Sequence, residues 1–227
     1  MKTSMRGAVV LILLLSVGGE RIAATRDASE SPLDVTVQIH DYVHLSPAVL
    51  STASDLVSRV YKSIGVRIDW LAPMRQEPSG GSASRRSSAP RNPPYEPSHS
   101  PIAQFTIIVL TPEMTQRGHI EEGVLGFAAV ATDGGLGRIA YVIYDRVQQQ
   151  ASSGAIDETD LMGLVMAHEI GHLLLGPGSQ GEAGLMKGRW DREDLRQFGL
   201  VTPRFSPREA EDIRAALAIE SDAQASR

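Results

Sequence analysis

Two histidines and a glutamate stand at a spacing that suits a metal ion in residues 167–176, which read Ala-His-Glu-Ile-Gly-His-Leu-Leu-Leu-Gly. Four residues are just over one helical turn, so His168 and His172 project from one face and their imidazoles can meet one ion. Glu169 is rotated by about 100° from His168, too far to chelate beside the rings but well placed to reach a water on the metal. The spacing predicts zinc on His168 and His172, with Glu169 as general base.

The residues around this motif predict that it lies on a buried helix. Residues 161–167 and 173–175 are apolar, so the helix is hydrophobic nearly all round. Imidazoles inside such a helix need polar partners, and zinc supplies one to both rings. Gly176 and Pro177 predict an αL stop. Three residues can cap the start of the helix: Asp157, Thr159 and Asp160.

The N-terminus predicts a secretory signal peptide. A basic stretch precedes an apolar run at residues 8–17, and small residues follow. The run is about half the length of a bilayer-spanning helix, which favours cleavage near Gly19 or Ala24 over an uncleaved anchor. We therefore expect residues 1–24 to be the signal peptide of a secreted or periplasmic protein, with no stable membrane span after cleavage.

Length and composition favour one catalytic domain, residues 25–227, in a chain of 227 residues that is 42% hydrophobic. The chain has no cysteine, which excludes disulfides, a cysteine-linked lipid anchor and a cysteine-ligated zinc site. Loss of residues 1–24 removes three basic residues and one acidic residue, so the net charge of −5 becomes −7. A charge of this sign argues against nucleic acid as the partner. The oligomeric state does not follow from the composition.

Hydropathy patterns predict an α+β fold. Alternation of apolar and polar residues indicates strands at 33–40 and 66–70. Between them, Ser46 and Pro47 cap and open an amphipathic helix that ends at Gly65. Such a strand, helix and strand unit usually gives parallel strands with a right-handed crossover.

The next segments complete the expected sheet. Residues 103–110 are almost continuously apolar, which predicts a central strand. Residues 124–130 and 138–144 flank the turn signal at 133–135 and predict a hairpin. We expect the first hairpin strand at the sheet edge beside the motif helix, where it can accept an extended peptide as an added strand. Residues 145–153 are expected to form a short helical or loop connection.

Three further segments lie outside this sheet. Residues 73–101 are dominated by Pro, Ser, Gly and Arg, and we expect a mobile surface insertion. A glycine-rich loop at 177–186 is expected to return the chain toward the metal. The sequence Ser-Pro-Arg-Glu at 206–209 is a capping box, which predicts a C-terminal helix to about Ile219 with a frayed tail beyond Glu220.

On these residues the chain resembles the zincin metalloproteases, and more particularly a metzincin-like secreted bacterial group. The resemblance rests on H-E-x-x-H and on the downstream Gly184-x-Met186, and it covers residues 161–190. It implies a zincin-like mixed twisted sheet packed on the buried active-site helix, a C-terminal helical part, Zn²⁺ on the motif histidines and peptide hydrolysis. Met186 matches the methionine turn beneath the metal of metzincins; the alternative for Met186 is ordinary core packing.

The third zinc ligand is where the chain departs from the extended pattern H-E-x-x-H-x-x-G-x-x-H. Leu175 stands at the position of the glycine and Gly178 at that of the histidine. The resemblance places a third histidine where this chain has Gln180, so Gln180 is the first candidate, although an amide oxygen is a poor substitute for imidazole. The other candidates are Glu182 and, on a following helix, Glu193 with its neighbours Asp191 and Asp194.

The function expected from these residues is a secreted zinc-dependent metalloprotease acting on a peptide or protein substrate. Zinc would lower the pKa of a water toward about 7, and Glu169 would take its proton and pass it to the leaving amine. The missing third histidine keeps open a non-catalytic zinc-binding module that holds a partner. A zinc hydrolase of a non-peptide amide or ester would carry the same motif. The remaining histidines are interpreted as solvated surface residues: His40, His44, His99 and His119.

Overall fold

The computed structural model describes residues 33–71, 101–132 and 135–226 of the chain. By its internal contacts the chain divides into two units, Met1–Ser31 and Pro32–Arg227. All described residues belong to the second unit.

Two sequence predictions fall outside the described residues. These are the signal peptide at 1–24 and, apart from Pro101, the insertion at 73–101. Among the described helices, none has the length and hydrophobicity needed to cross a membrane. The predicted single domain at 25–227 stays a prediction.

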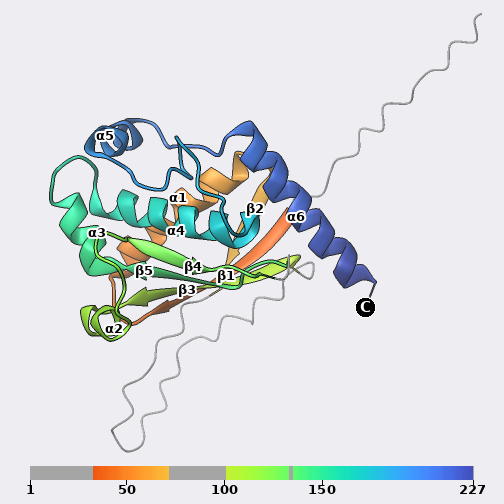
Figure 1. The fold of residues 1–227 in the computed structure, drawn as a ribbon, viewed down its shortest axis with the longest axis horizontal. Helices are drawn as coiled ribbons and strands as arrows, with labels where there is room; N and C mark the ends of the chain where they lie inside the picture. Colours follow the sequence, from red (N-terminus) through yellow and green to blue (C-terminus); the bar gives the residue numbers. More distant parts are fainter. Residues whose placement is uncertain (1–32, 72–100, 133–134, 227) are drawn as a thin grey trace, which may run out of the picture. The chain divides into compact units, whose positions relative to one another are not determined.

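The described residues form a mixed α/β structure of five strands and six helices (Figure 1). In chain order the elements are β1 (Leu33–Asp41), α1 (Pro47–Lys62), β2 (Val66–Trp70), β3 (Ala103–Leu110), α2 (Pro112–Arg117), β4 (Gly126–Ala129), β5 (Ile139–Ile143), α3 (Tyr144–Ala151), α4 (Glu158–Leu175), α5 (Arg192–Leu200) and α6 (Pro207–Ala225). This content is compatible with the predicted α+β class. The predicted connection at 145–153 is largely the helix α3.

The five strands form one mixed sheet in the order β2-β1-β3-β5-β4. The first four strands are parallel, and β4 runs antiparallel to β5. Three predictions are thereby confirmed: the parallel pairing of β1 with β2, the central position of β3, and the β4–β5 hairpin with β4 at the edge. The alternation that predicted β1 is visible only in its second half, where Val37 and Ile39 are buried and Gln38 and His40 are half-buried; in the first half the polar Asp34 and Thr36 are buried as well.

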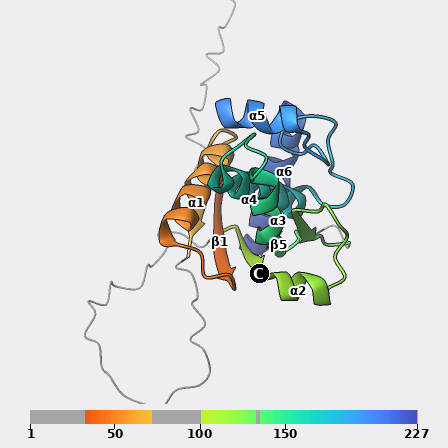
Figure 2. The same ribbon diagram turned by 90° about the vertical axis from the view of Figure 1, so that its left-hand side faces the viewer.

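Helices α1 and α4 lie side by side on one face of the sheet (Figures 1 and 2). Their close approach depends on Gly163 of α4, where a β-carbon would lie 2.9 Å from the carbonyl oxygen of Ala53 and 3.1 Å from Cβ of Leu56. The buried hydroxyl of Tyr61 donates a hydrogen bond of 3.0 Å to the carbonyl of Ala167, and burial raises its pKa well above the usual value. Helix α1 thus holds α4 one residue before the motif.

The helix ends follow the sequence signals with two corrections. Asp157 caps α4, accepting a 2.8 Å bond from the amide of Thr159. Gly176 ends α4 with φ 77°, but its ψ of −167° lies outside the predicted αL region. Ser206 forms the predicted capping box of α6, yet α6 runs to Ala225, so the expected fraying beyond Glu220 is wrong.

The longer α6 has a tertiary cause. The side chain of Gln224 donates to the carbonyl of Ile102 at 2.5 Å, beside the start of β3. Glu220 also pairs with Arg138 at 2.7 Å, just before β5. These contacts tie the last turns of α6 to the ends of two strands, and no local pattern in the tail encodes them.

We predict that Gly163→Ala lowers the free energy of unfolding by about 1–3 kcal/mol, because the added methyl group meets backbone atoms of α1 that must move apart. The matched control is Gly199→Ala in α5, where a β-carbon would lie 3.6 Å from its nearest neighbour, the carbonyl oxygen of Ala155. That variant should gain up to about 1 kcal/mol from helix propensity. Urea unfolding measures both, and equal effects would contradict the described packing of α1 on α4.

Candidate metal centre

Helix α4 brings the two motif histidines together as their spacing predicts. The Nε2 atoms of His168 and His172 lie 3.0 Å apart. The ring centroids are 4.6 Å apart, and the ring planes are inclined by 84°. Two Zn–N bonds of about 2.0–2.1 Å at a tetrahedral angle place their nitrogens about 3.3 Å apart, so the observed separation is shorter by about 0.3 Å than the one that a single ion requires.

The opposite nitrogen of each ring is held by the loop that follows α4. Nδ1 of His168 lies 2.7 Å from the carbonyl oxygen of Leu185, which can only accept a hydrogen bond. Nδ1 of His172 lies 2.7 Å from Oγ of Ser179, which itself donates to the carbonyl of Gly176 at 2.8 Å. Because the hydroxyl of Ser179 donates its single hydrogen to the carbonyl of Gly176, its Oγ must accept from Nδ1 of His172. Both rings donate from Nδ1.

The facing nitrogens consequently carry no proton when both rings are neutral. Burial lowers the pKa of His168, against the opposing effects of the Leu185 carbonyl and the carboxylate of Glu209. Burial, and then the neighbouring His168, lowers the pKa of His172 to about 4. At neutral pH two bare lone pairs therefore face each other at hydrogen-bonding distance without a hydrogen between them. A cation is the partner that satisfies both.

Glu169 lies between α4 and the edge strand β4. Its side chain is 4% exposed, and a β-carbon on Gly126 would lie 2.8 Å from its Oε1. Oε2 is buried without a hydrogen-bond partner, and burial raises the pKa of the carboxyl group to about 8. A carboxyl group with a pKa near neutrality can both take and release a proton, as a general base requires.

An aromatic pair borders the histidines. The ring of Trp190 meets His168 edge to face at 5.3 Å, and Phe198 of α5 meets Trp190 at 5.7 Å. The indole Nε1 of Trp190 is also buried without a hydrogen-bond partner. Sequence reasoning did not identify Trp190 as part of the site, because no motif marks it and it lies well beyond the end of α4.

Met186 is fully buried beneath α4. A β-carbon on Gly171 would lie 2.6 Å from the sulfur of Met186 and 3.2 Å from the ring of Phe205. The residue before it, Leu185, supplies the carbonyl that holds His168. The packing of Met186 therefore holds the loop after α4 against the histidine pair, as predicted. This packing does not depend on a bound metal.

The candidate third ligands make contacts with residues other than the two motif histidines. The exposed Gln180 places its amide against Gly188, where a β-carbon would lie 2.5 Å from Oε1. Glu182 is exposed, and Glu193 pairs with Arg196 at 3.2 Å. Asp191 caps α5 and Asp194 completes its capping box. Within residues 33–71, 101–132 and 135–226, no third His, Cys, Asp or Glu joins the pair to form a group that could hold a metal.

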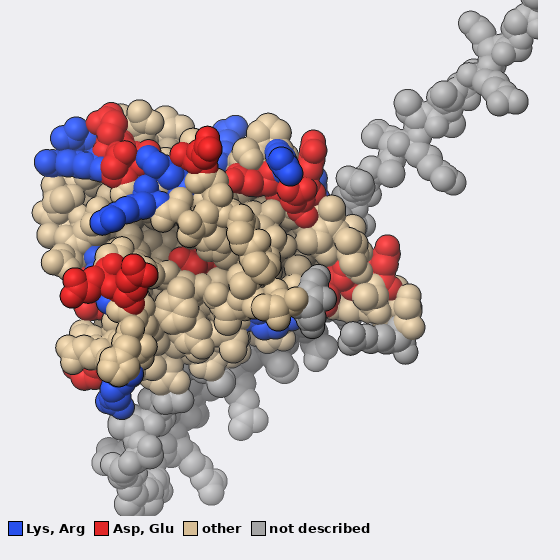
Figure 3. All heavy atoms as spheres, viewed as in Figure 1, with Lys and Arg blue, Asp and Glu red and all other residues tan. Residues whose placement is uncertain are grey.

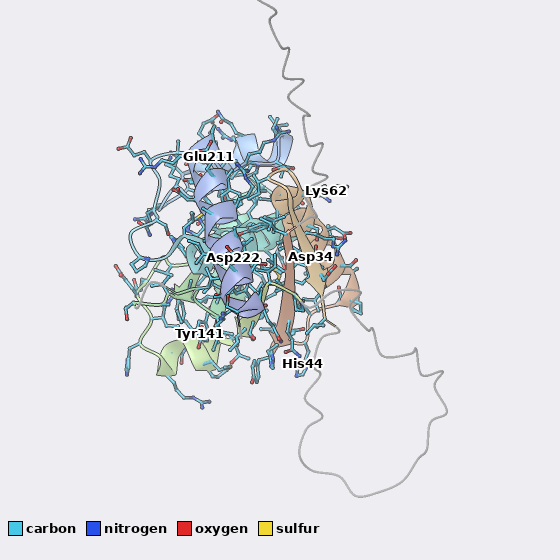
Figure 4. All side chains as sticks on the ribbon, turned by 90° about the vertical axis from the view of Figure 1, so that its right-hand side faces the viewer. Asp34, His44, Lys62, Tyr141, Glu211 and Asp222 are labelled. Carbon is cyan, nitrogen blue, oxygen red and sulfur yellow. The ribbon has the colours of Figure 1, made fainter. Side chains whose placement is uncertain are left out.

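The other described histidines lie on the surface or at its margin. His44 and His119 are exposed and adopt positive φ angles of 62° and 49°. Figure 4 shows His44 beyond the end of β1. His40 is half-buried on β1, and His99 lies outside the described residues.

No protein-family model matches the chain, and no curated protein matches it. The functional conclusion therefore depends on the geometry of the site.

We predict that Glu169→Gln changes the pH dependence of stability in the metal-free protein. The folded pKa of about 8 lies above the ordinary 4.5, so the folded state binds more protons between these values and loses stability as pH rises through that window. Glutamine does not titrate and removes this loss. The gain in the free energy of unfolding caused by Glu169→Gln should therefore be about 2–4 kcal/mol larger at pH 8 than at pH 5.

Urea unfolding in the presence of a chelator at both pH values measures this difference. Glu193→Gln, on the exposed face of α5, is the matched control and should show no such pH-dependent gain. An equal effect of Glu169→Gln at pH 5 and pH 8 would disprove the raised pKa.

Proposed function

We propose that the chain is a secreted zinc-dependent metalloprotease with a zincin-like fold. One observation supports this above the others: two unprotonated Nε2 atoms lie 3.0 Å apart on a buried helix, beside a buried carboxyl group with an unpartnered oxygen. Neither feature benefits a folded chain by itself, because bare lone pairs and an unpartnered carboxyl oxygen both lose hydrogen bonds that water would provide. The donor set of two imidazoles suits zinc. Secretion rests on the predicted signal peptide at 1–24.

The roles of the chain's own residues follow from their positions. His168 and His172 would hold the ion through Nε2. Bound there, zinc would supply a Lewis acid that polarises the substrate carbonyl and lowers the pKa of a water toward about 7. Glu169 takes a proton from the water while the water oxygen bonds to the carbonyl carbon of the substrate. It then releases the proton to the nitrogen of the breaking C–N bond.

The edge strand β4 supports a peptide as substrate. It ends the sheet, contacts α4, and passes Glu169 at Gly126. An extended peptide that added to this edge would pass Glu169, the proposed base. In the face shown in Figure 3, the surface over α4 and β4 is mostly uncharged; one acidic group is visible near its middle, and the other charged side chains lie mainly toward the margins. We therefore expect the enzyme to cleave beside uncharged residues.

A second candidate is a non-catalytic zinc-binding module that holds a partner. It is favoured by the lack, among the described residues, of a third His, Cys, Asp or Glu in the histidine group. A hydrolase of a non-peptide amide or ester would use the same residues as the protease. Substrate assays separate these three possibilities.

We predict that the exported protein binds one zinc per chain and cleaves an unfolded protein substrate. Glu169→Gln should retain the zinc and lose at least about 100-fold in kcat, because the proton acceptor is removed while both ligands stay. Glu211→Gln, at an exposed position of α6, should match the parent in both respects. Elemental analysis and a proteolysis assay give the two readouts.

The outcomes discriminate between the candidates. Zinc binding with cleavage only of simple esters or amides would favour the non-peptide hydrolase. Stoichiometric zinc without any hydrolysis would favour the binding module. Absence of stoichiometric zinc from the zinc-loaded wild type would refute the metal site itself.

We predict that Gln180→His tightens zinc binding and Gln180→Ala weakens it, if Gln180 turns from Gly188 to complete the ligand set. Imidazole is a much better zinc ligand than an amide oxygen, so the histidine variant should bind at least about 10-fold more tightly. Competition with a chromophoric chelator measures the affinity. Glu211→Gln, at an exposed position of α6, is the control. Unchanged affinity in both Gln180 variants would exclude this position.

A further inference from the structure

We propose that Ser179 is a positioning residue, which sets the tautomer of His172 and thereby keeps the Nε2 atoms of both histidines open to a metal ion. The inference rests on the metal site of the proposed function. It is supported by a relay of two hydrogen bonds: Nδ1 of His172 to Oγ of Ser179 at 2.7 Å, and Oγ to the carbonyl oxygen of Gly176 at 2.8 Å.

The relay matters because a hydroxyl group has no fixed polarity. An isolated serine beside an imidazole can either donate or accept, and the ring can adopt either tautomer. The carbonyl of Gly176 removes this choice, because it accepts the only hydrogen of Ser179. His172 must then donate from Nδ1, which leaves its Nε2 free of hydrogen.

The two histidines are controlled in different ways. His168 donates to the backbone carbonyl of Leu185, an obligate acceptor that no substitution of a side chain removes. His172 depends on a single side chain, that of Ser179 in the loop after α4. A point substitution of the hydrogen-bond partner can therefore change the tautomer of His172 but not that of His168.

The alternative tautomer would close the site. With the proton on Nε2, His172 would donate to the bare Nε2 of His168, which lies at a hydrogen-bonding distance of 3.0 Å. That bond would satisfy the two facing nitrogens without a metal, because the lone pair of His168 would accept a hydrogen bond and that of His172 would carry the proton. An incoming ion would have to break it and displace its proton. Ser179 therefore selects the open arrangement over the self-paired one.

The backbone at the end of α4 supports the relay. Gly176 has φ 77°, and its amide still donates to the carbonyl of His172 at 3.0 Å. The next residues turn the chain so that Ser179 returns to the carbonyl of Gly176. This conformation is one that L-residues rarely adopt, which accounts for glycine at position 176.

The test compares Ser179→Ala with Ser179→Thr in the full chain. Thr retains the hydroxyl and Ala removes it. Ser63→Ala is the matched control, because Ser63 also donates to a carbonyl three residues earlier, that of Val60 at 2.6 Å, but contacts neither motif histidine. The readouts are the ¹⁵N chemical shifts of the imidazoles in the metal-free protein, which report the tautomer, and the zinc affinity by chelator competition.

We expect the wild type to show His172 protonated on Nδ1. Ser179→Ala should move the proton to Nε2 and weaken zinc binding by about 10–100-fold, the usual cost of losing a hydrogen-bond partner behind a metal ligand. Ser179→Thr should restore both readouts, and Ser63→Ala should change neither.

The proposal is overturned if Ser179→Ala retains the Nδ1 proton, or if Ser63→Ala weakens zinc binding equally. Loss of affinity in Ser179→Thr as large as in Ser179→Ala would also overturn it. Failure of the proposed function is a separate result: a wild type that binds no zinc refutes the metal site, while the tautomers of the metal-free protein still decide the role of Ser179.

Discussion

The contact between two unprotonated imidazole nitrogens, 3.0 Å apart on α4, is the constraint on which the rest of the site depends. It persists only because each ring donates from its other nitrogen, His168 to Leu185 and His172 to Ser179. Both acceptors belong to the loop after α4, and Met186 packs that loop beneath the helix against Gly171. Core packing therefore fixes the loop, the loop fixes the tautomers, and the tautomers determine whether the pair can accept a metal.

Burial has opposite consequences for the groups of the site. It keeps the histidines neutral, which favours metal binding, and it keeps the carboxyl group of Glu169 protonated up to about pH 8 in the metal-free chain. A cation beside Glu169 would favour its ionised form and so offset part of the effect of burial on its pKa. Among the described residues four buried polar atoms lack a partner, and one of them is the indole nitrogen of Trp190, whose ring contacts His168. Two of the four, on Glu169 and Trp190, thus lie where a ligand would supply their partners.

Local signals account for what the sequence predicted. The helical spacing of the motif and the cap of α4 each depend on a few neighbouring residues; the structure agrees with the spacing and selects Asp157 among the three predicted caps. The alternation along β1 is also local, and the structure follows it in the second half of the strand. The placement of Ser179 and Trp190 against the histidines depends on the path of a glycine-rich loop, for which no periodicity exists. The extension of α6 likewise depends on a tertiary bond from Gln224 to the carbonyl of Ile102. The third zinc ligand could not be predicted for the same reason, because it requires the position of a side chain in that loop and not a spacing along the chain.

The edge strand and the base share one contact, and this couples substrate position to catalysis in the proposed enzyme. At Gly126 a β-carbon would lie 2.8 Å from both Oε1 of Glu169 and the carbonyl oxygen of Tyr141, so any side chain would displace the carboxylate or the strand. The stacking of Phe127 on Tyr141, with centroids 4.5 Å apart, holds β4 against β5 at this point. Because the glycine lets the strand lie directly against Glu169, a peptide added to β4 would approach the base through backbone geometry alone. The distance between the scissile bond and the base would then be set by the fold, and the bound residues would determine only how well the peptide fits.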